Sequence, residues 1–244
     1  MRFGVKTDKG LIREKNEDFF NVIFGETDVP NCFIVADGMG GHKSGEVASA
    51  LAVEVVSKSF LKQKGYFGEE QNVVKIITDV MKEANSKVLQ KSKEEVLNKG
   101  MGTTLIMAVV SKEKLCIGHV GDSRAYLFRN KKLERITTDH SYIEELIKNG
   151  TLTKKEARNH PKKNVITRAL GSEEEVDIDI YSRDIKQGDV FMVCTDGLTN
   201  MLTDKEIVNI LIEFDDPQEA CDKFIYMANE KGGRDNTTVV VFKR

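Results

Sequence analysis

Four aspartates in this 244-residue sequence share one local setting, in which a strand-like apolar run meets a glycine-containing loop. They are Asp37, Asp122, Asp196 and Asp235. Because aspartate is disfavoured in strand interiors, we expect each of them at one end of a strand. The neighbouring glycines let the backbone come close to whatever the carboxylate binds. One Asp-Gly pair alone predicts only a turn, but several at the ends of neighbouring strands bring their carboxylates to one edge of the sheets.

Convergent carboxylates repel one another and are driven to protonate unless a cation lies among them. Carboxylate oxygens and water suit Mg²⁺, Mn²⁺ or Ca²⁺, and the sequence has no Cys/His cluster that would favour zinc. Asp18, which directly precedes an apolar run at 19–24, is a fifth candidate ligand. Gly38 adds a backbone carbonyl, since no side chain blocks approach to it. The sequence therefore predicts a site for hard divalent cations.

Two such ions, ~3.5–4 Å apart, hold and deprotonate a bridging water and polarise a phosphoryl oxygen. The nucleophile is then hydroxide, and no covalent phosphoenzyme forms. This chemistry needs one positive side chain that holds the phosphate during in-line attack. Arg13 is the best candidate because its planar fork pairs with phosphate oxygens in bidentate fashion. An ordinary surface arginine is the alternative at this position.

Other phosphate-handling motifs are absent or incomplete. Thiol-based phosphatases need an arginine six residues after the cysteine, and the four cysteines have Gly, Asp, Asn and Met there. Asp177 and Asp179 have the Asp-x-Asp spacing of haloacid-dehalogenase-type phosphatases, but the alternation around them predicts a plain strand over 176–180. Residues 41–44 resemble a phosphate-binding loop without its full spacing. These comparisons leave the metal-dependent route as the favoured one.

Hydrophobic patterns predict the elements that position these residues. Short, apolar, β-branched-rich runs predict strands at 19–24, 32–36, 104–110, 115–120, 125–129, 132–136, 176–180, 190–194 and 237–242. Helical spacing and capping signals predict helices at 44–63, 69–93 and 203–212, and a further helix that begins near Pro217. Strand blocks and helix blocks are segregated, which favours an α+β protein with face-to-face, mainly antiparallel sheets and helices outside.

The segment 141–164 differs from its surroundings. Two capping boxes, at 141–144 and 153–156, predict two short helices, and polar, basic stretches lie between and after them. An ordinary surface loop and a flap that faces a substrate both fit this pattern.

Composition limits the classes of function. The length fits one large domain or two small ones. The net charge is −2 and no block is strongly basic, which argues against nucleic acid as the main partner. The apolar runs are too short to span a bilayer, and residues 1–5 contain no signal core. The four cysteines lack paired spacing and are expected to be reduced thiols of a cytoplasmic protein without membrane attachment. Nothing demands more than a monomer.

An ordered set of motifs runs along the whole chain. In sequence order these are Arg13-x-x-Asn16-Glu17-Asp18, 35–42 (Val-Ala-Asp-Gly-Met-Gly-Gly-His), 102–104 (Gly-Thr-Thr), 121–124 (Gly-Asp-Ser-Arg), 139–140 (Asp-His), 166–171 (Ile-Thr-Arg-Ala-Leu-Gly), 195–197 (Thr-Asp-Gly) and 233–238 (Gly-Arg-Asp-Asn-Thr-Thr). Any one of them is a weak signal. Together, and in this order, they resemble the metal-dependent (type 2C, PPM) serine/threonine protein phosphatases, in particular their short bacterial form.

The resemblance implies a central β-sandwich flanked by helix pairs, in four layers α-β-β-α, with the metals in a cleft at one edge. It implies that residues 1–244 form a single catalytic domain in which 141–164 is a variable flap beside the cleft. By position, Asp37 bridges two Mn²⁺ or Mg²⁺ ions, and Gly38 gives its carbonyl to one of them. Asp196 and Asp235 complete the other ion's ligands.

Three further roles follow from the resemblance. Asp122 together with Asp196 forms a weaker third metal site, which is typical of bacterial members. Asp18 or Glu17 acts near the second metal, directly or through water. Arg13 holds the substrate phosphate.

The chain departs from the family pattern at Met39, where many eukaryotic members carry a histidine proposed to protonate the leaving alkoxide. Methionine has no proton to donate. We expect a metal-bound water, on the third ion for example, or His42 to supply this proton. For His42, a loop residue that fixes the flap or the start of the helix is the alternative.

The resemblance predicts a phosphatase that removes phosphate from phosphoserine or phosphothreonine in proteins and opposes a serine/threonine kinase. Phosphorylated proteins, a kinase among them, are the expected partners. One alternative is a non-catalytic relative that binds phosphoproteins, whose mark would be lost carboxylates. Another is an enzyme of the same fold that acts on a different phosphorylated substrate.

Overall fold

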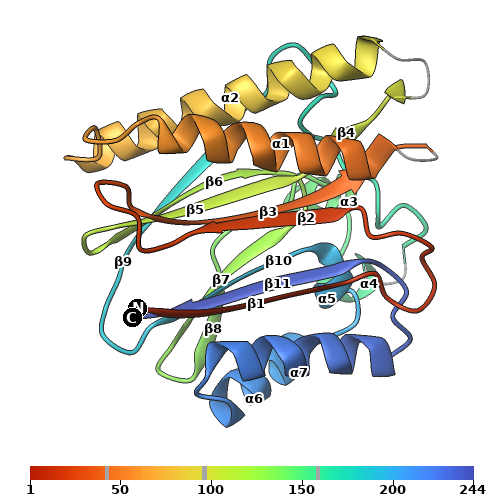
Figure 1. The fold of residues 1–244 in the computed structure, drawn as a ribbon. Coiled ribbons are helices and arrows are strands. Elements are labelled where there is room, and N and C mark those ends of the chain that lie inside the picture. Colours follow the sequence, from red (N-terminus) through yellow and green to blue (C-terminus); the bar gives the residue numbers. More distant parts are fainter. Residues whose placement is uncertain (42–43, 95–97, 158–159) are drawn as a thin grey trace.

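A computed structural model describes residues 1–41, 44–94, 98–157 and 160–244. In these residues the strands form two antiparallel sheets that pack face to face (Figure 1). One sheet has the order β1 (Arg2–Asp8), β11 (Thr237–Lys243), β10 (Val190–Cys194), β7 (Arg124–Arg129) and β8 (Lys132–Arg135). The other has the order β2 (Asp18–Ile23), β3 (Asn31–Met39), β5 (Leu105–Ser111), β6 (Lys114–Val120) and β9 (Asp179–Asp184), with β4 (Gly102–Thr103) paired to the end of β3.

Two pairs of helices cover the outer faces of the sheets. Helices α1 (Ser44–Leu61) and α2 (Glu70–Glu94) lie on the β2–β9 sheet, and α6 (Asp204–Glu213) and α7 (Pro217–Glu230) lie on the β1–β8 sheet (Figure 1). The capping box at Thr203 begins α6, and Pro217 occupies the first turn of α7. The predicted α+β class with four layers, α-β-β-α, is confirmed.

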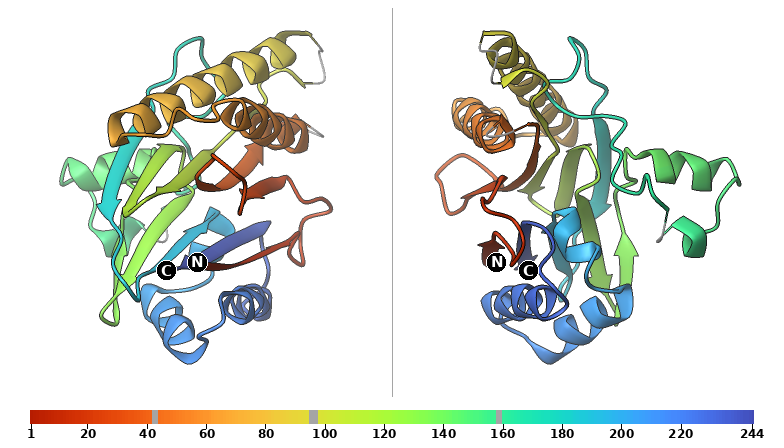
Figure 2. Two further views of the ribbon diagram at one scale, coloured as in Figure 1. Left: turned by 60° about the vertical axis from the view of Figure 1, so that its left-hand side comes forward. Right: turned by 90° about the vertical axis from the view of Figure 1, so that its right-hand side faces the viewer.

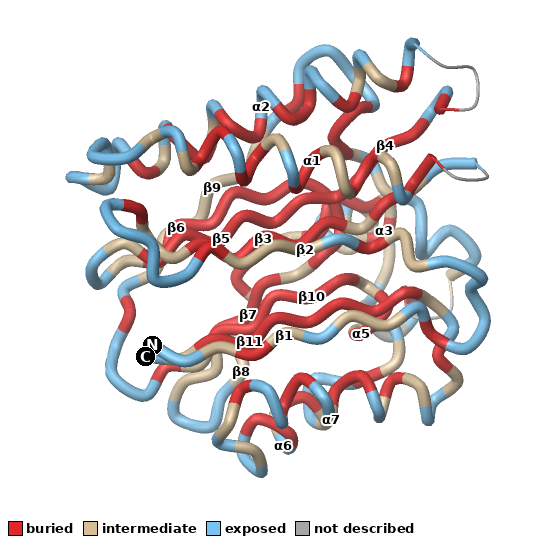
Figure 3. The backbone as a smooth tube through the Cα atoms, viewed as in Figure 1, coloured by how far each residue is buried: buried red, intermediate tan, exposed pale blue. Residues whose placement is uncertain are grey.

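Strand β3 shows how the sequence builds these layers. Because successive side chains on a strand point to opposite faces, Phe33 and Val35 lie in the core between the sheets, whereas Ile34 and Ala36 pack against the helix pair. Both faces of β3 are buried, as the red tube in Figure 3 shows. The ring of Phe33 stacks on Phe242 of β11 at 4.1 Å between centroids, which joins the two sheets.

The predicted short helices in 141–164 are present as α3 (Tyr142–Lys148) and α4 (Lys154–Ala157). They project from the side of the sandwich (Figure 2, right). The Ser141 hydroxyl caps α3 by accepting a hydrogen bond from the Glu144 amide at 3.3 Å. An isolated bridge between Ser141 and Ile166 closes the base of this projection.

Two of the longer strands differ from the sequence-based expectation. The strand predicted at 176–180 is wrong in its bounds, because β9 begins only at Asp179. Val176 and Ile178 still pack against the α1–α2 core, so the alternation reflects burial just before the strand rather than pairing. The N-terminal strand β1 was not predicted; it pairs with β11 along its whole length.

Two predictions from composition can be compared with the structure. All four cysteines are buried and unpaired, as expected of core thiols. Among the described residues, none of the helices combines the length and apolarity needed to cross a bilayer.

Candidate metal-binding site

The fold brings the five predicted aspartates to one end of the sandwich, on the right in Figure 1. Asp18 begins β2, and Asp37 lies near the end of β3 as its register partner. Asp122 follows β6, Asp196 follows β10, and Asp235 precedes β11 by two residues. Asp196 is also the first residue of a helical turn that the sequence analysis missed, α5 (Asp196–Thr199). The prediction that these aspartates lie at or near the ends of strands is therefore correct.

The carboxyl groups are close enough to change one another's pKa. Burial raises the pKa of Asp37 well above its usual range, and the charges of Asp18, Asp196, Asp122 and Asp235 raise it further. Burial and then the charge of Asp235 raise the pKa of Asp196. Mutual repulsion of this kind is the expected property of a cluster that receives a cation.

Asp18 lies deepest in the cluster. It is 5% exposed, and its Oδ2 atom accepts hydrogen bonds from the hydroxyls of Thr195 (2.9 Å) and Thr238 (2.8 Å). Its Oδ1 atom is buried without a hydrogen-bond partner. Burial raises the pKa of Asp18 to about 7, although the two hydroxyls oppose the shift.

Asp122 has the same signature. It is 7% exposed, and its Oδ1 atom is buried without a partner. Burial, followed by the charges of Asp196 and Asp139, raises its pKa to about 8. A buried carboxylate oxygen without a donor is costly, and a divalent cation satisfies it. The donor set, all oxygen, fits Mg²⁺ or Mn²⁺.

The carboxylates are close enough to affect one another's charge but are not drawn together around one point. Within the described ranges, no three Asp, Glu, His or Cys side chains are grouped as they must be to hold an ion. Several site oxygens instead have protein partners: Asn200 donates to Asp196 Oδ2 at 2.9 Å, and Arg13 donates to Asp235 Oδ2 at 2.9 Å. Small side-chain rotations therefore have to accompany metal binding.

Gly38 is required by the packing of the chain itself. A Cβ atom at this position would lie 2.1 Å from the carbonyl oxygen of Gly45 in the first turn of α1. The Gly38 amide donates to the carbonyl of Glu17 at 3.1 Å. The missing side chain thus lets β3 approach α1.

Gly197 plays a similar part between two loops. A Cβ atom there would lie 1.9 Å from the carbonyl oxygen of Asn236. This close approach holds the loop of Asp196 against the loop of Asp235. The Asn236 side chain in turn accepts from the Glu17 amide at 2.8 Å, which ties in the segment before Asp18.

Arg13 lies at the rim of the cluster and is half exposed. Its guanidinium pairs with Asp235, so the structure places the predicted phosphate-binding side chain next to a predicted metal ligand. An exposed pair of this kind contributes little free energy. The guanidinium is therefore free to exchange a carboxylate for a phosphate.

Two residues that hold the site were not singled out from the sequence, although both lie in the ordered motifs. The Thr104 hydroxyl accepts from the Asp37 amide at 2.9 Å and also bonds the Ser123 hydroxyl at 2.8 Å. It thereby joins β3 to the loop of Asp122.

His140 holds both backbone groups of Gly121, the residue before Asp122. The His140 amide donates to the Gly121 carbonyl at 2.8 Å, and the Gly121 amide donates to His140 Nδ1 at 3.0 Å. The ring also lies 3.2 Å from Asp179, through Nε2, and the His140 carbonyl accepts from Thr167 at the base of the 141–166 projection. His140 thus connects the Asp122 loop to that projection.

The proton-donor hypotheses remain predictions. Met39 pairs with Gly102 in the short β3–β4 ladder, so a methionine occupies the end of β3 beside the cluster. His42 falls outside the described residues. The Glu17 carboxyl borders the site, and burial raises its pKa while the charge of Arg13 opposes the shift.

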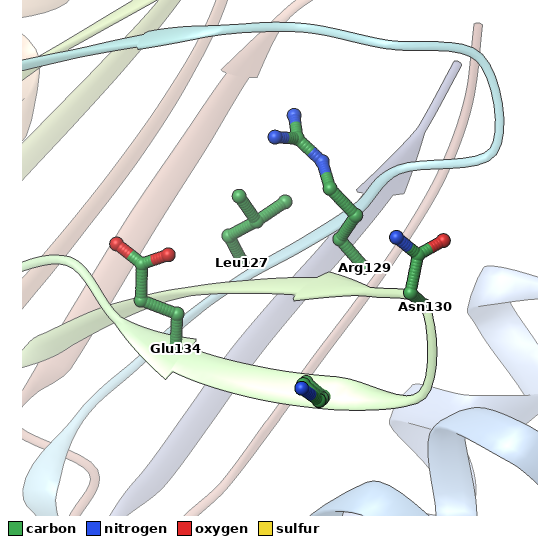
Figure 4. Close-up of a pocket in the computed structure, with 5 residues that line it drawn as sticks. Leu127, Arg129, Asn130 and Glu134 are labelled. Atoms are coloured by element: carbon green, nitrogen blue, oxygen red, sulfur yellow. The ribbon is translucent and has the colours of Figure 1, made fainter.

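A surface hollow of about 250 Å³ lies elsewhere, on the β7–β8 hairpin (Figure 4). It is lined by Leu127, Arg129, Asn130, Lys132 and Glu134. Arg129 there is engaged with Asp189 at 2.6 Å rather than free to bind a ligand. The hollow contains none of the predicted site residues.

Comparison with known sequences identifies relatives that match nearly the whole chain. The serine/threonine phosphatase stp of Listeria welshimeri is 39% identical over 239 residues, which is 98% of this chain and 94% of the relative. The protein phosphatase PhpP of Streptococcus pneumoniae is 33% identical over 241 residues, or 99% and 96% of the two chains.

Solved structures give the same result. The serine/threonine phosphatase PstP/Ppp of Mycobacterium tuberculosis superposes with a TM-score of 0.88 at 32% identity, covering 100% of this chain and 99% of that one. The catalytic domain of PstP in complex with two manganese ions gives 0.85 at 33% identity, covering 98% and 96%. The family model described as Protein phosphatase 2C matches residues 13–229. On the evidence of its fold, the matching family model and these relatives, the chain belongs to the protein phosphatase 2C family.

Proposed function

We propose that this protein is a metal-dependent protein serine/threonine phosphatase whose Mn²⁺ or Mg²⁺ ions bind among the clustered aspartates. One observation carries the proposal: two deeply buried aspartates, Asp18 and Asp122, each keep a carboxylate oxygen without a partner in the same cluster. Membership of the family and a solved relative that holds two manganese ions support it.

In this proposal Asp37 would be shared by two core ions, and the Gly38 carbonyl would be a ligand of one of them. Asp196 and Asp235 would hold the other. Asp122 and Asp196 would hold a weaker third ion, which is supported by the unpartnered oxygen of Asp122.

Asp18 or Glu17 acts near the second core ion, directly or through water. The hydroxyls of Thr195 and Thr238 fix one oxygen of Asp18, and the other oxygen has no hydrogen-bond partner, which supports this role.

When bound, the ions supply an activated water nucleophile and polarise the phosphoryl oxygens. The chain's own residues orient the substrate. Arg13 leaves Asp235 and holds the phosphate through its planar fork, which keeps the ester in line for attack. The hydroxyl of Thr104 fixes the backbone of Asp37, and His140 fixes the backbone before Asp122, so two ligand loops are preorganised.

The substrates in this proposal are proteins that carry phosphoserine or phosphothreonine, including a serine/threonine kinase. The relatives are named serine/threonine phosphatase and protein phosphatase, which supports this class. We further propose a single catalytic domain over 1–244 with a flap at about 141–164, acting as a cytoplasmic monomer. The projection of α3 and α4 beside the site end supports the flap.

The test is hydrolysis of a panel that contains a phosphoserine peptide, a phosphothreonine peptide and small phosphorylated metabolites. The protein is first treated with a chelator, and Mn²⁺ or Mg²⁺ is then restored. We expect peptide hydrolysis only after an ion is restored, with the small metabolites turned over much more slowly. Turnover of metabolites alone would instead identify an enzyme of the same fold with another substrate, and phosphopeptide binding without turnover would identify a non-catalytic regulator.

A further inference from the structure

Two large aliphatic side chains are unusually exposed beside Arg13. Leu11 is 66% exposed and Ile12 is 69% exposed, more than any other leucine, isoleucine or valine of the described residues. Single exposed apolar residues are common on protein surfaces, whereas contiguous exposed apolar surface is where partners bind. We call these two side chains the Leu11–Ile12 rim.

The backbone of the rim is held firmly against the loop before β11. The amides of Leu11 and Ile12 both donate to the carbonyl of Gly233, at 2.7 and 3.2 Å. Gly10, just before the rim, has a positive φ of 78°, and a Cβ atom there would lie 2.5 Å from the carbonyl oxygen of Asp235. These contacts hold the turn at residues 10–12 against the loop of Asp235, and the turn leaves the two aliphatic side chains exposed.

Asn236 fixes the same segment at further points. Its side-chain amide donates to the carbonyls of Lys9 (2.9 Å) and Lys15 (2.7 Å), on either side of the rim. Its side-chain oxygen accepts from the Glu17 amide. Because these bonds are already formed, a partner that contacts the rim does not have to order it first.

Exposed basic side chains lie on both sides of the rim. Lys9 and Arg234 are exposed, and in the described ranges neither is engaged in an ion pair. Within the described part of the chain Arg13 pairs with Asp235. Glu14 is the one acidic residue in 9–15, and Asp8 and Glu17 lie just outside that stretch. An aliphatic contact flanked by basic side chains suits a phosphorylated polypeptide segment better than a neutral apolar surface.

We propose that the Leu11–Ile12 rim binds an aliphatic side chain of the substrate protein, located within three residues of the phosphorylated serine or threonine. This inference rests on the proposed function, because Arg13 sets the position of the phosphate. Successive Cα atoms are about 3.8 Å apart, and an extended chain advances about 3.3 Å per residue. The two residues that precede Arg13 are therefore within reach of side chains a few positions from a phosphoamino acid whose phosphate is on Arg13.

The experiment uses a phosphoserine peptide with glycine at the three positions on each side, and six derivatives with leucine at one of these positions. The proteins are the wild type, the double variant Leu11→Ser/Ile12→Ser and the single variant Ile12→Ser. The matched control is Ile212→Ser, which changes a 51% exposed isoleucine on α6. The kcat/KM for each peptide is divided by the kcat/KM for p-nitrophenyl phosphate, which has no flanking residues.

For at least one leucine position, we expect the wild type to prefer the leucine peptide over the glycine peptide by about fivefold, mainly through KM. The double variant loses this preference, Ile12→Ser loses part of it, and Ile212→Ser keeps it. Wild-type protein without a preference at any position overturns the proposal, as does a preference that survives in the double variant. If instead no substrate is hydrolysed by the wild type in Mn²⁺, the proposed function fails and not only the rim.

Discussion

Asp18 and Asp37 are direct register partners across the antiparallel pair β2–β3. Opposed residues in such a pair project to the same face, with Cβ atoms about 4.5–5.5 Å apart, and like charges placed there are destabilising. Burial and the charges of neighbouring aspartates raise the pKa of both carboxyls. This arrangement costs folding free energy unless protons or a cation neutralise the charges. The stability of the fold should therefore depend on both pH and metal binding.

The first prediction concerns pH and stability without metal. Asp18 and Asp122 bind more protons in the native protein than in the unfolded chain between the ordinary carboxyl pKa near 4 and their raised values, about 7 and about 8. Stability therefore falls as the pH rises through this window. We expect the free energy of unfolding in EDTA to be lower at about pH 8.5 than at about pH 5.5, by on the order of 2–4 kcal/mol.

Urea unfolding at the two pH values measures this difference. Asp18→Asn removes one titrating group and should reduce it, and Mn²⁺ should reverse it at the higher pH. Equal stability at the two pH values, in both proteins, would contradict the buried cluster.

The second prediction separates the two contacts of Arg13. Because its pair with Asp235 is exposed, Arg13→Ala should change the affinity for Mn²⁺ by less than about fivefold. The loss of phosphate binding should lower kcat/KM for a phosphopeptide by about 100-fold, with partial recovery in Arg13→Lys because lysine lacks the planar fork. Calorimetric Mn²⁺ titration and peptide hydrolysis give the two values. If Mn²⁺ affinity and kcat/KM for the phosphopeptide fell together by similar factors, Arg13 would act on the metals instead.

The third prediction concerns the support of Asp122. His140→Ala removes the acceptor for the Gly121 amide and should weaken the weakest Mn²⁺ binding step by about tenfold. Asn at this position offers an oxygen near the place of Nδ1, so His140→Asn should restore part of the affinity. Titration calorimetry measures the step. An unchanged weak step in His140→Ala, in a protein that is folded by circular dichroism, would refute the link.

The fourth prediction tests the contact between two ligand loops. Gly197→Ala places a Cβ atom 1.9 Å from a backbone oxygen of Asn236 and should destabilise the protein by about 3 kcal/mol. Gly68→Ala is the matched control, because no atom lies within 4 Å of its added Cβ. Urea midpoints compare the two. Similar stability in both variants would show that the loops are free to separate.

The location of the site could be predicted because its signals are local. Asp37 and Asp196 each follow an apolar run and precede a glycine. This local pattern predicts the end of a strand wherever the strand lies in the fold. The same signals could not give register, so the pairing of Asp18 with Asp37 emerges only from the sheet.

The supporting residues depend on contacts between distant segments. His140 reaches Gly121 from 19 residues away, and no periodicity in the sequence marks that bond. The alternation at 176–180 indicated burial correctly but not strand pairing, since packing against α2 and pairing in a sheet leave the same pattern. The sequence likewise does not show that Gly38 must be a glycine for packing reasons. That requirement comes from the close approach of Gly45, which exists only when α1 is folded against β3.

The most direct test is Mn²⁺-dependent phosphopeptide hydrolysis by chelator-treated wild type and Asp37→Asn, with Mn²⁺ binding measured on the same samples. We predict that the wild type is inactive after chelation and recovers with Mn²⁺, whereas Asp37→Asn binds Mn²⁺ at least tenfold more weakly and stays nearly inactive. Full hydrolysis in the presence of chelator, or by Asp37→Asn with unchanged Mn²⁺ affinity, would contradict a metal centre built on these aspartates.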